Sequence, residues 1–285
     1  MKRLGAWLLL VLAAGASAVT DDRGADVRLR APPKRIVSLM PSVTEGICEL
    51  GACDRLVGVD DYSNWPARVQ ALPHVGGLVD ASIERIVALR PDVVFLDANA
   101  RALPRLQSLG IPVAGFDIRT LRDVDSVLHR VGQLLDVPGA DGIGKRIEAG
   151  IEQAARSVPP PARGLSVYFE VDDGPYAASE DSHIGELLRR LGAANVVPAS
   201  LGSVPKLNPE FVVRADPQVI MIGARNAPGL AARPGWSRIR AVREGRVCAF
   251  TPTQADVIVR PGPRLAEAAR LLADCLAGRM TGARR

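Results

Sequence analysis

Short apolar runs alternate with amphipathic stretches along the first half of the chain. The short runs are rich in Val, Ile and Leu and predict strands, whereas the amphipathic stretches have the spacing of helices. The expected strands cover residues 35–40, 56–60, 93–96 and 113–116, and the expected helices cover residues 43–50, 83–89 and 100–109. Strands and helices that alternate in this way indicate a parallel sheet, because each helix returns the chain to the starting edge.

The pattern changes after Leu121. Two long helical stretches, 121–135 and 140–157, follow each other with no strand between them. The run from Pro159 to Pro161 ends the second stretch, and a second series of strands and helices then begins. Its expected strands cover residues 165–171, 219–222 and 246–250, and its expected helices cover residues 183–191, 209–215 and 263–276.

This order of elements predicts an α/β protein made of two Rossmann-like lobes, each with a central, mostly parallel sheet. We assign residues 30–135 to the N-terminal lobe and residues 163–278 to the C-terminal lobe. Residues 139–158 form the single long helix that we expect to bridge them. A Gly/Ser-rich linker, which is typical of independently moving domains, is absent from the sequence.

Two segments repeat one scheme. SIERIVALRPDVVFL at 82–96 and NPEFVVRADPQVIMI at 208–222 share a helix-capping residue, an acid, an apolar helix face, an arginine, a proline and an apolar strand. The repeat predicts one equivalent helix and strand in each lobe. Glu84 and Glu210 therefore occupy equivalent positions in the first turn of a helix, where the helix dipole alone would favour a carboxylate by ~0.3–1 kcal/mol.

Residues 1–18 have the pattern of a secretory signal sequence. Lys2 and Arg3 precede an apolar run that ends in Ala16-Ser17-Ala18, an A-x-A cleavage site. The run is shorter than the ~20 residues that span a bilayer. We therefore expect cleavage after Ala18 and secretion, without a lipid anchor, because no cysteine follows the small residues of this region.

Charge and composition argue against nucleic-acid binding. The formal charge of +5 falls to +3 when Lys2 and Arg3 are removed with the signal sequence. Aromatic residues make up only 4% of the chain, and the arginines alternate with acids. Nucleic-acid binders more often have a basic face interleaved with aromatic residues.

The cysteines suit an oxidising compartment. Cys48 and Cys53 are close in sequence around an expected helix end, and Cys248 and Cys275 lie on an expected strand and the last helix. Three connectivities are compatible with the sequence, and buried free thiols are the alternative. The absence of a C-x-x-C motif gives no support for redox or metal chemistry.

No catalytic motif stands out. The sequence has no G-x-S-x-G elbow, and His74, His129 and His183 are too scattered to indicate a catalytic triad or a metal centre. We expect no catalytic residue and no bound metal, and we keep a secreted α/β enzyme as a remote alternative.

The stretch KRIVSLMPSVTE, residues 34–45, passes from a strand through a Pro-Ser turn into a helix. Such a junction lies at the carboxyl edge of a parallel sheet, where backbone amides and hydroxyls can meet a ligand. Ser42 and Thr44 are therefore candidate ligand-binding residues. The alternative for Ser42 is a helix cap, completed by Glu45 as the third residue of a capping box.

The chain resembles the periplasmic substrate-binding proteins of ABC importers for cobalamin and ferric siderophores. The matching segments are RIVSLMPSVTE, LVGVDDYSNWP, ALPHVGG, SIERIVALRPDVV, GRVCAF and RPGPRL, in that order along the chain. The resemblance implies two lobes that grip a bulky small molecule in an interlobe cleft and dock onto an inner-membrane permease dimer with its ATPase subunits. It also implies a monomer in the periplasm. The cobalamin-binding branch is the most similar, and ferric siderophore or haem is the alternative ligand.

The resemblance also implies roles for single residues. Glu84 and Glu210 match the acids that dock into arginine pockets of the permease. Tyr62 and Tyr176 match aromatic residues that line the cleft, and aromatic faces suit a flat macrocycle.

Asp256 and Arg260 match the acid and base that face amide and phosphate groups of cobalamin. A surface ion pair between these residues is the alternative. Where the cobalamin branch places tryptophans, this chain has Leu78 and Val204. That departure thins the aromatic lining and leaves the ligand open.

Overall fold

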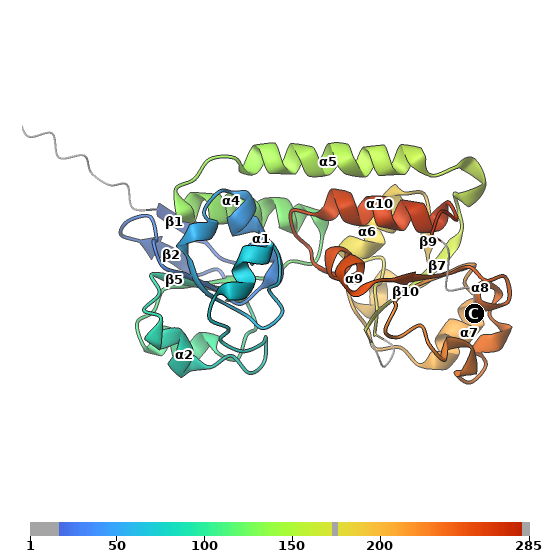
Figure 1. Ribbon diagram of the computed structural model, residues 1–285, viewed down its shortest axis with the longest axis horizontal. Coiled ribbons are helices and arrows are strands. Elements are labelled where there is room, and N and C mark those ends of the chain that lie inside the picture. Colours follow the sequence, from blue (N-terminus) through green and yellow to red (C-terminus); the bar gives the residue numbers. More distant parts are fainter. Residues whose placement is uncertain (1–16, 173–175, 281–285) are drawn as a thin grey trace, which may run out of the picture.

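The computed structural model describes residues 17–172 and 176–280, arranged as two lobes beneath one long helix (Figure 1). The predicted signal sequence lies almost entirely outside the described residues. The sheet of the N-terminal lobe has the strand order β4-β3-β5-β6, and all its strands are parallel. These strands are β3 (Ile36–Ser38), β4 (Leu56–Val59), β5 (Val93–Asp97) and β6 (Val113–Phe116). The helices of this lobe are α1 (Pro41–Glu49), α2 (Ile83–Ala88), α3 (Leu103–Ser108) and α4 (Leu121–Leu135).

A hairpin that the pattern did not predict precedes this sheet. Strands β1 (Ser17–Thr20) and β2 (Asp26–Leu29) pair antiparallel, and Val19 and Leu29 are buried in the core. The Asp21 carboxylate accepts a hydrogen bond of 3.0 Å from the Gly115 amide, which ties the hairpin to the end of β6. The N-terminal lobe therefore begins before the predicted boundary at residue 30.

The C-terminal lobe has the strand order β11-β10-β7-β8, with β9 also pairing with β7. β8 is antiparallel to β7, and the other pairs are parallel. The strands are β7 (Ser166–Asp172), β8 (Tyr176–Ala177), β9 (Ala194–Asn195), β10 (Val219–Gly223) and β11 (Val247–Phe250). The helices are α6 (His183–Arg190), α7 (Pro209–Ala215), α8 (Arg240–Arg243), α9 (Pro252–Val259) and α10 (Leu265–Leu276).

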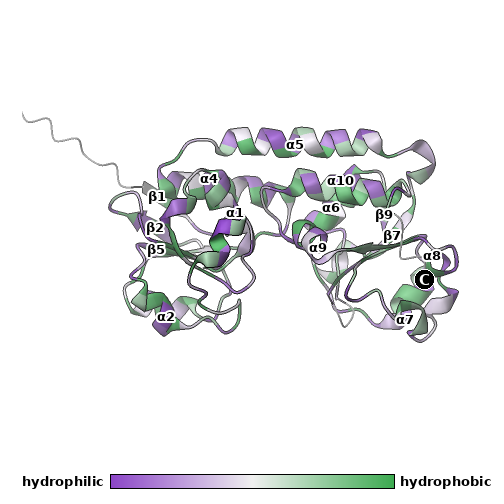
Figure 2. Cartoon of the chain, viewed as in Figure 1, coloured by the Kyte–Doolittle hydropathy of each residue, from purple (hydrophilic) through white to green (hydrophobic). Residues whose placement is uncertain are grey.

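Helix α5 (Ala140–Ser157) runs along one side of both lobes, as predicted (Figure 1). It alternates hydrophilic and hydrophobic positions (Figure 2), and Ile143, Ile147 and Ile151 on its apolar side are buried. Its Gly150 lies so close to α10 that a Cβ there would come within 2.4 Å of the Ala266 Cβ. One hydrophobic core cluster continues from the N-terminal lobe through α5 into the C-terminal lobe. Bending α5 would break its hydrogen bonds and expose this face, so the bridge is stiff.

Of the pairings that the sequence left open, the structure has Cys48–Cys53 and Cys248–Cys275, both disulfide-bonded. Cys48–Cys53 ties the end of α1 to the turn before β4, and Cys248–Cys275 joins β11 to α10. Within the described part of the chain, no helix combines the length and apolar character needed to span a membrane.

Candidate functional site at the junction of the lobes

The Pro-Ser turn after β3 lies at the junction of the lobes. Helix α1 begins at Pro41, its N-cap residue is Met40, and no side chain caps it, so the capping box of Ser42 and Glu45 is wrong. Ser42 instead lies beneath the C-terminal lobe, since a Cβ on Gly262 would be 3.3 Å from the Ser42 Cα. Proline supplies the helical φ angle of the first residue, which is why the helix starts without a cap.

Thr44 belongs to a buried network of hydroxyl groups. Its side chain donates to the Ser38 Oγ at 2.9 Å, and the Ser63 hydroxyl, whose Oγ lies 3.0 Å from the Thr44 Oγ1, donates to the Asp60 carboxylate. Burial raises the pKa of Asp60, although the Ser63 hydroxyl and the Tyr62 amide donate to it. Thr44 has no exposed surface, so it supports the turn from below and presents no hydroxyl at the surface.

Glu45 of α1 forms an ionic contact between the lobes with two arginines of the C-terminal lobe. Its carboxylate accepts hydrogen bonds from Arg260 at 3.1 Å and from Arg264 at 2.9 and 2.7 Å. Arg260 also donates to the Asn64 Oδ1 at 2.8 Å and to the Tyr62 carbonyl at 2.9 Å. We call these four side chains, together with Asp256, the Glu45 cluster; its members are Glu45, Asn64, Asp256, Arg260 and Arg264.

The structure brings the predicted pair Asp256 and Arg260 together within the Glu45 cluster. Their closest nitrogen–oxygen distance is 3.0 Å, and Asp256 also accepts from the Asn64 amide at 2.9 Å. The Arg260 side chain is only 9% exposed and its donors face protein oxygens. Arg260 therefore holds the lobes together in this structure, and little of its guanidinium faces solvent.

A second contact between the lobes lies at the start of α6. The His183 amide donates to the Arg119 carbonyl of the N-terminal lobe at 2.6 Å, and the Leu121 amide donates to the Glu186 carboxylate at 2.7 Å. The His183 Nε2 lies 2.9 Å from the Ile258 carbonyl. Burial lowers the pKa of His183 to about 4, so the imidazole is neutral near pH 7 and donates from Nε2.

These contacts show how the two sheets face each other. Glu45 and Arg119 follow the carboxyl ends of β3 and β6, and Arg260 lies beyond the carboxyl end of β11, after α9. Since both lobes meet through residues that follow strand ends, the carboxyl edges of the sheets are turned toward each other. In open α/β sheets this is the edge at which ligands bind.

Both carboxyl edges present exposed aromatic and apolar side chains. In the N-terminal lobe, the Tyr62 side chain follows β4, is 64% exposed, and packs beside Gly77, whose neighbour Leu78 is also exposed. In the C-terminal lobe, Tyr176 opens β8 and is 39% exposed, and Val204 is exposed nearby in the chain that pairs with β8. Large apolar groups left in solvent on two facing edges are a feature of interaction sites.

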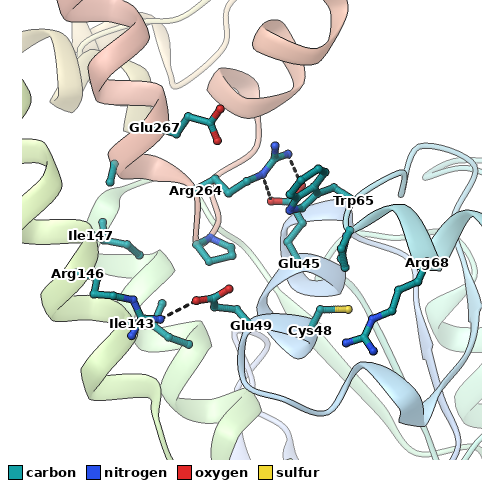
Figure 3. A pocket seen from close by; sticks show the side chains of 13 residues that line it. Glu45, Cys48, Glu49, Trp65, Arg68, Ile143, Arg146, Ile147, Arg264 and Glu267 are labelled. Atoms are coloured by element: carbon teal, nitrogen blue, oxygen red, sulfur yellow. Dashed lines mark hydrogen bonds and ion pairs between the residues drawn. The ribbon is translucent and has the colours of Figure 1, made fainter.

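A pocket of about 460 Å³ opens on the side of the junction that faces α5 (Figure 3). Side chains from α1, α5, α10 and the loop at Trp65 line it, and none of the predicted ligand-binding residues does. Its acids and bases are largely paired with each other, as in Glu49–Arg146 and Glu45–Arg264. Arg264 also lies over the Trp65 ring, 5.0 Å from its centroid. The pocket therefore carries no clear excess of either charge.

Trp236 and the two predicted docking residues, Glu84 and Glu210, do not line this pocket. Trp236 is fully buried and packs edge-on against Tyr168 in the core of the C-terminal lobe. Glu84 and Glu210 are exposed in the first turns of α2 and α7, capped by Ser82 and Asn208, as the repeat predicted. Glu84 also lies at the rim of a groove between α2 and α3.

Sequence reasoning missed two residues of the junction. The capping-box prediction for Glu45 overlooked that it is the only charged residue between Arg35 and Glu49, which was a signal that a buried partner exists. Asn64 gave no signal, because its contacts with Asp256 and Arg260 depend on how the lobes meet.

A family model described as periplasmic binding protein matches residues 36–253. The chain belongs to the periplasmic binding protein family. It is 28% identical to an ABC transporter substrate-binding lipoprotein, YvrC, of Bacillus subtilis, over 96% of this chain and 97% of the relative. It is 27% identical to the vitamin B12-binding protein of Pectobacterium carotovorum, over 84% of this chain and 86% of the relative.

Solved structures share the fold. The apo periplasmic heme-binding protein RhuT of Roseiflexus sp. RS-1 superposes with a TM-score of 0.75 at 26% identity, over 86% of this chain and 98% of that chain. The vitamin B12-binding protein BtuF of Vibrio cholerae has a TM-score of 0.67 at 23% identity, over 86% of this chain and 97% of that chain. The second likeness supports the fold alone.

Proposed function

We propose that this protein is the periplasmic substrate-binding component of an ABC importer and that it captures a corrinoid between its lobes. It then delivers the ligand unchanged to the inner-membrane permease and its ATPase subunits. Family membership and the relatives named as vitamin B12-binding proteins support this assignment. So do two lobes joined by a stiff bridge, because such a scaffold suits a large, preformed ligand.

The observation that carries the proposal is the pair of facing edges with exposed aromatic and apolar side chains. Tyr62 and Leu78 from one lobe and Tyr176 and Val204 from the other offer dispersion contacts to both faces of a flat macrocycle. A site built in this way binds by surface complementarity and needs few polar anchors. No covalent chemistry is required of these residues.

Haem is the second candidate ligand. It is favoured by the Tyr62 side chain, which is exposed and which as a tyrosinate would be able to ligate iron. It is also favoured by the likeness to RhuT. Ferric siderophores are a third class, and their anionic groups would need a cation that is not already paired.

Calorimetric titration of the mature protein with cyanocobalamin, haemin and two ferric siderophores tests the proposal. We expect a one-to-one complex with cyanocobalamin. Binding of haemin or of a siderophore alone would replace the corrinoid assignment and keep the receptor. Absence of binding to all four compounds, together with turnover of another small molecule, would favour an enzyme.

Glu84 and Glu210 are proposed to dock onto the permease. Both are exposed, they lie on equivalent helices of the two lobes, and Arg214 lies 4.0 Å from Glu210 across one helical turn. Reversing both charges with Glu84→Lys and Glu210→Lys should leave the Kd for the ligand unchanged and abolish uptake into cells or permease-containing vesicles. Arg105→Glu, which changes a charge in the groove beside Glu84, is a milder comparison. Normal uptake by the double variant would contradict the docking role.

Secretion without a lipid anchor is also a proposal. The prediction places cleavage after Ala18, so the intact mass of the mature protein should correspond to a chain that begins at Val19. Recovery of a lipid-modified protein from the membrane fraction, as the lipoprotein relative of Bacillus subtilis suggests, would overturn it.

A further inference from the structure

The segment that ends at Lys206 forms an added strand next to β8. The Ala177 amide donates to the Pro205 carbonyl at 3.1 Å, and the Ser179 amide donates to the Ser203 carbonyl at 3.0 Å. Tyr176 and Lys206 are directly paired in an antiparallel bridge. Directly opposed residues of antiparallel strands have their side chains on the same face, so Tyr176 and Lys206 lie side by side.

Alternation along this segment separates its two faces. Val204 and Lys206 are exposed, whereas Leu207 is buried and Pro205 is partly buried. Because side chains alternate between faces, Val204 lies on the same side as Lys206 and Tyr176. We call the outward surface made by Tyr176, Val204 and Lys206 the Tyr176 face.

Lys206 is the charged member of the Tyr176 face. The Lys206 Nζ lies 5.7 Å from the centroid of the Tyr176 ring, at the edge of the cation–π range. Among the described residues, no carboxylate lies within ion-pair distance of Lys206. An exposed ammonium beside an exposed aromatic ring is complementary to a ligand that combines a flat ring with an anionic group.

The two arginines of the Glu45 cluster are already paired with protein groups, which leaves Lys206 as the candidate cation for an anionic ligand. Arg260, which the resemblance assigned to phosphate groups, is committed to Glu45, Asn64 and the Tyr62 carbonyl. Arg264 is likewise committed to the Glu45 carboxylate. Neither arginine is available to an anionic ligand unless the junction opens.

We propose that the Tyr176 face is the anion-recognition part of the ligand site, where Lys206 pairs with a carboxylate or phosphate group of the ligand and Tyr176 and Val204 contact its ring. This inference rests on the proposed function. We add that Lys206 determines specificity for a macrocycle that carries such a carboxylate or phosphate group over one that lacks it.

The test compares two pairs of compounds on the mature protein and on the variant Lys206→Met, which keeps the length and apolar stem of the side chain. The first pair is cyanocobalamin, whose nucleotide loop carries a phosphodiester, and dicyanocobinamide, which lacks the whole loop. We call the member of each pair that carries a phosphate or carboxylate its anionic member, although cyanocobalamin has no net charge. The second pair is protoporphyrin IX and its dimethyl ester, which lacks the carboxylates. The pairs thus distinguish a phosphate from a carboxylate as the recognised anion.

We expect Lys206→Met to weaken binding of the anionic member of the recognised pair by roughly tenfold, the size of a charged hydrogen bond, and to leave its neutral member unchanged. The matched control is Lys145→Met, at an exposed lysine on α5, which should leave the affinity for both members unchanged. Added salt should reduce the difference in affinity between the two members for the wild-type protein, because it screens the charge of Lys206. It should leave the difference unchanged for Lys206→Met.

Equal affinities of wild-type protein and Lys206→Met for the anionic compounds would overturn this inference and leave the proposed function intact. A similar loss for anionic and neutral members would also overturn it, because Lys206 would then act through packing alone. If the wild-type protein bound neither pair, the inference would fall together with the corrinoid and haem assignments.

Discussion

Arg260 and Lys206 both lie near the carboxyl edge of the C-terminal sheet, yet their surroundings are opposite. Arg260 is 9% exposed, pairs with Glu45 and Asp256, and donates to two further oxygens. Lys206 is exposed and has an aromatic ring as its neighbour. The first cation is part of the structure that joins the lobes, and the second is available to a ligand.

Residue type therefore does not by itself identify a ligand-binding residue. Arginine forms bidentate pairs with carboxylates well and tolerates burial when it is paired, so it suits a permanent contact between lobes. Lysine is a flexible, strongly hydrated point charge, and water stabilises its ammonium group when no protein partner is present. Four experiments test this difference, in order of decreasing expected effect.

The largest effect is expected from Glu45→Ala. The substitution leaves Arg260 and Arg264 with little exposure and without their shared carboxylate, and an uncompensated buried charge costs about 3–5 kcal/mol. Urea unfolding measures the loss in the free energy of unfolding. Glu49→Ala, which removes an exposed partner of Arg146, is the matched control and should cost less than about 1 kcal/mol. Equal losses in both variants would show that the Glu45 cluster does not stabilise the junction.

The second-largest effect is expected from acidification, which should lower the free energy of unfolding through His183. Its folded pKa of about 4 lies below the ordinary value of 6.5, so at higher pH both states are neutral and the contribution is absent. As the pH falls from 6.5 toward 4, the unfolded chain binds a proton that the folded protein excludes, and stability falls by ~2–3 kcal/mol. The excess loss should disappear in His183→Gln, measured by urea unfolding at several pH values. Parallel curves for the two proteins would contradict the buried neutral imidazole.

A direct comparison of Arg260→Met with Lys206→Met separates structure from recognition. Arg260→Met should lower the free energy of unfolding by about 1–3 kcal/mol, because the Tyr62 carbonyl and the Asn64 side chain lose a charged donor. Lys206→Met should change it by less than about 0.5 kcal/mol, as exposed substitutions do. Thermal or urea unfolding of both variants gives the answer. A larger loss in Lys206→Met would reverse the two roles.

The smallest effect is expected from Asp256→Asn. The Asp256 side chain is 34% exposed, and its pairing with Arg260 is screened by water, so the loss should stay below about 1 kcal/mol. The same unfolding assay detects it, and Asp274→Asn, at a surface pair with Arg279 on the far end of α10, is a comparable control. A loss as large as that of Glu45→Ala would mean that Asp256, too, is an essential counter-ion.

Much of the fold followed from local pattern. Helices 121–135, 140–157 and 209–215 were predicted with the bounds that the structure has, because their ends carry prolines, glycines and capping side chains that act within one turn. The equivalent positions of Glu84 and Glu210 followed in the same way, whereas the pairing of the cysteines, which the sequence left open, was settled by the structure. Helix α9 was missed because its β-branched residues weaken the helical pattern, although Thr251 and Gln254 form a capping box.

The tertiary structure alone determines which polar groups are paired inside the protein and which face outward. Glu45 and Arg260 are 215 positions apart in the chain, and α6, β9 and a 3-10 turn separate β8 from the added strand at Lys206. Hydrogen bonds and ion pairs depend on distances of about 3 Å, and those distances are set by how the lobes pack. The sequence therefore determined most of the elements and the family, and tertiary packing determined that Arg260 is paired between the lobes while Lys206 is exposed.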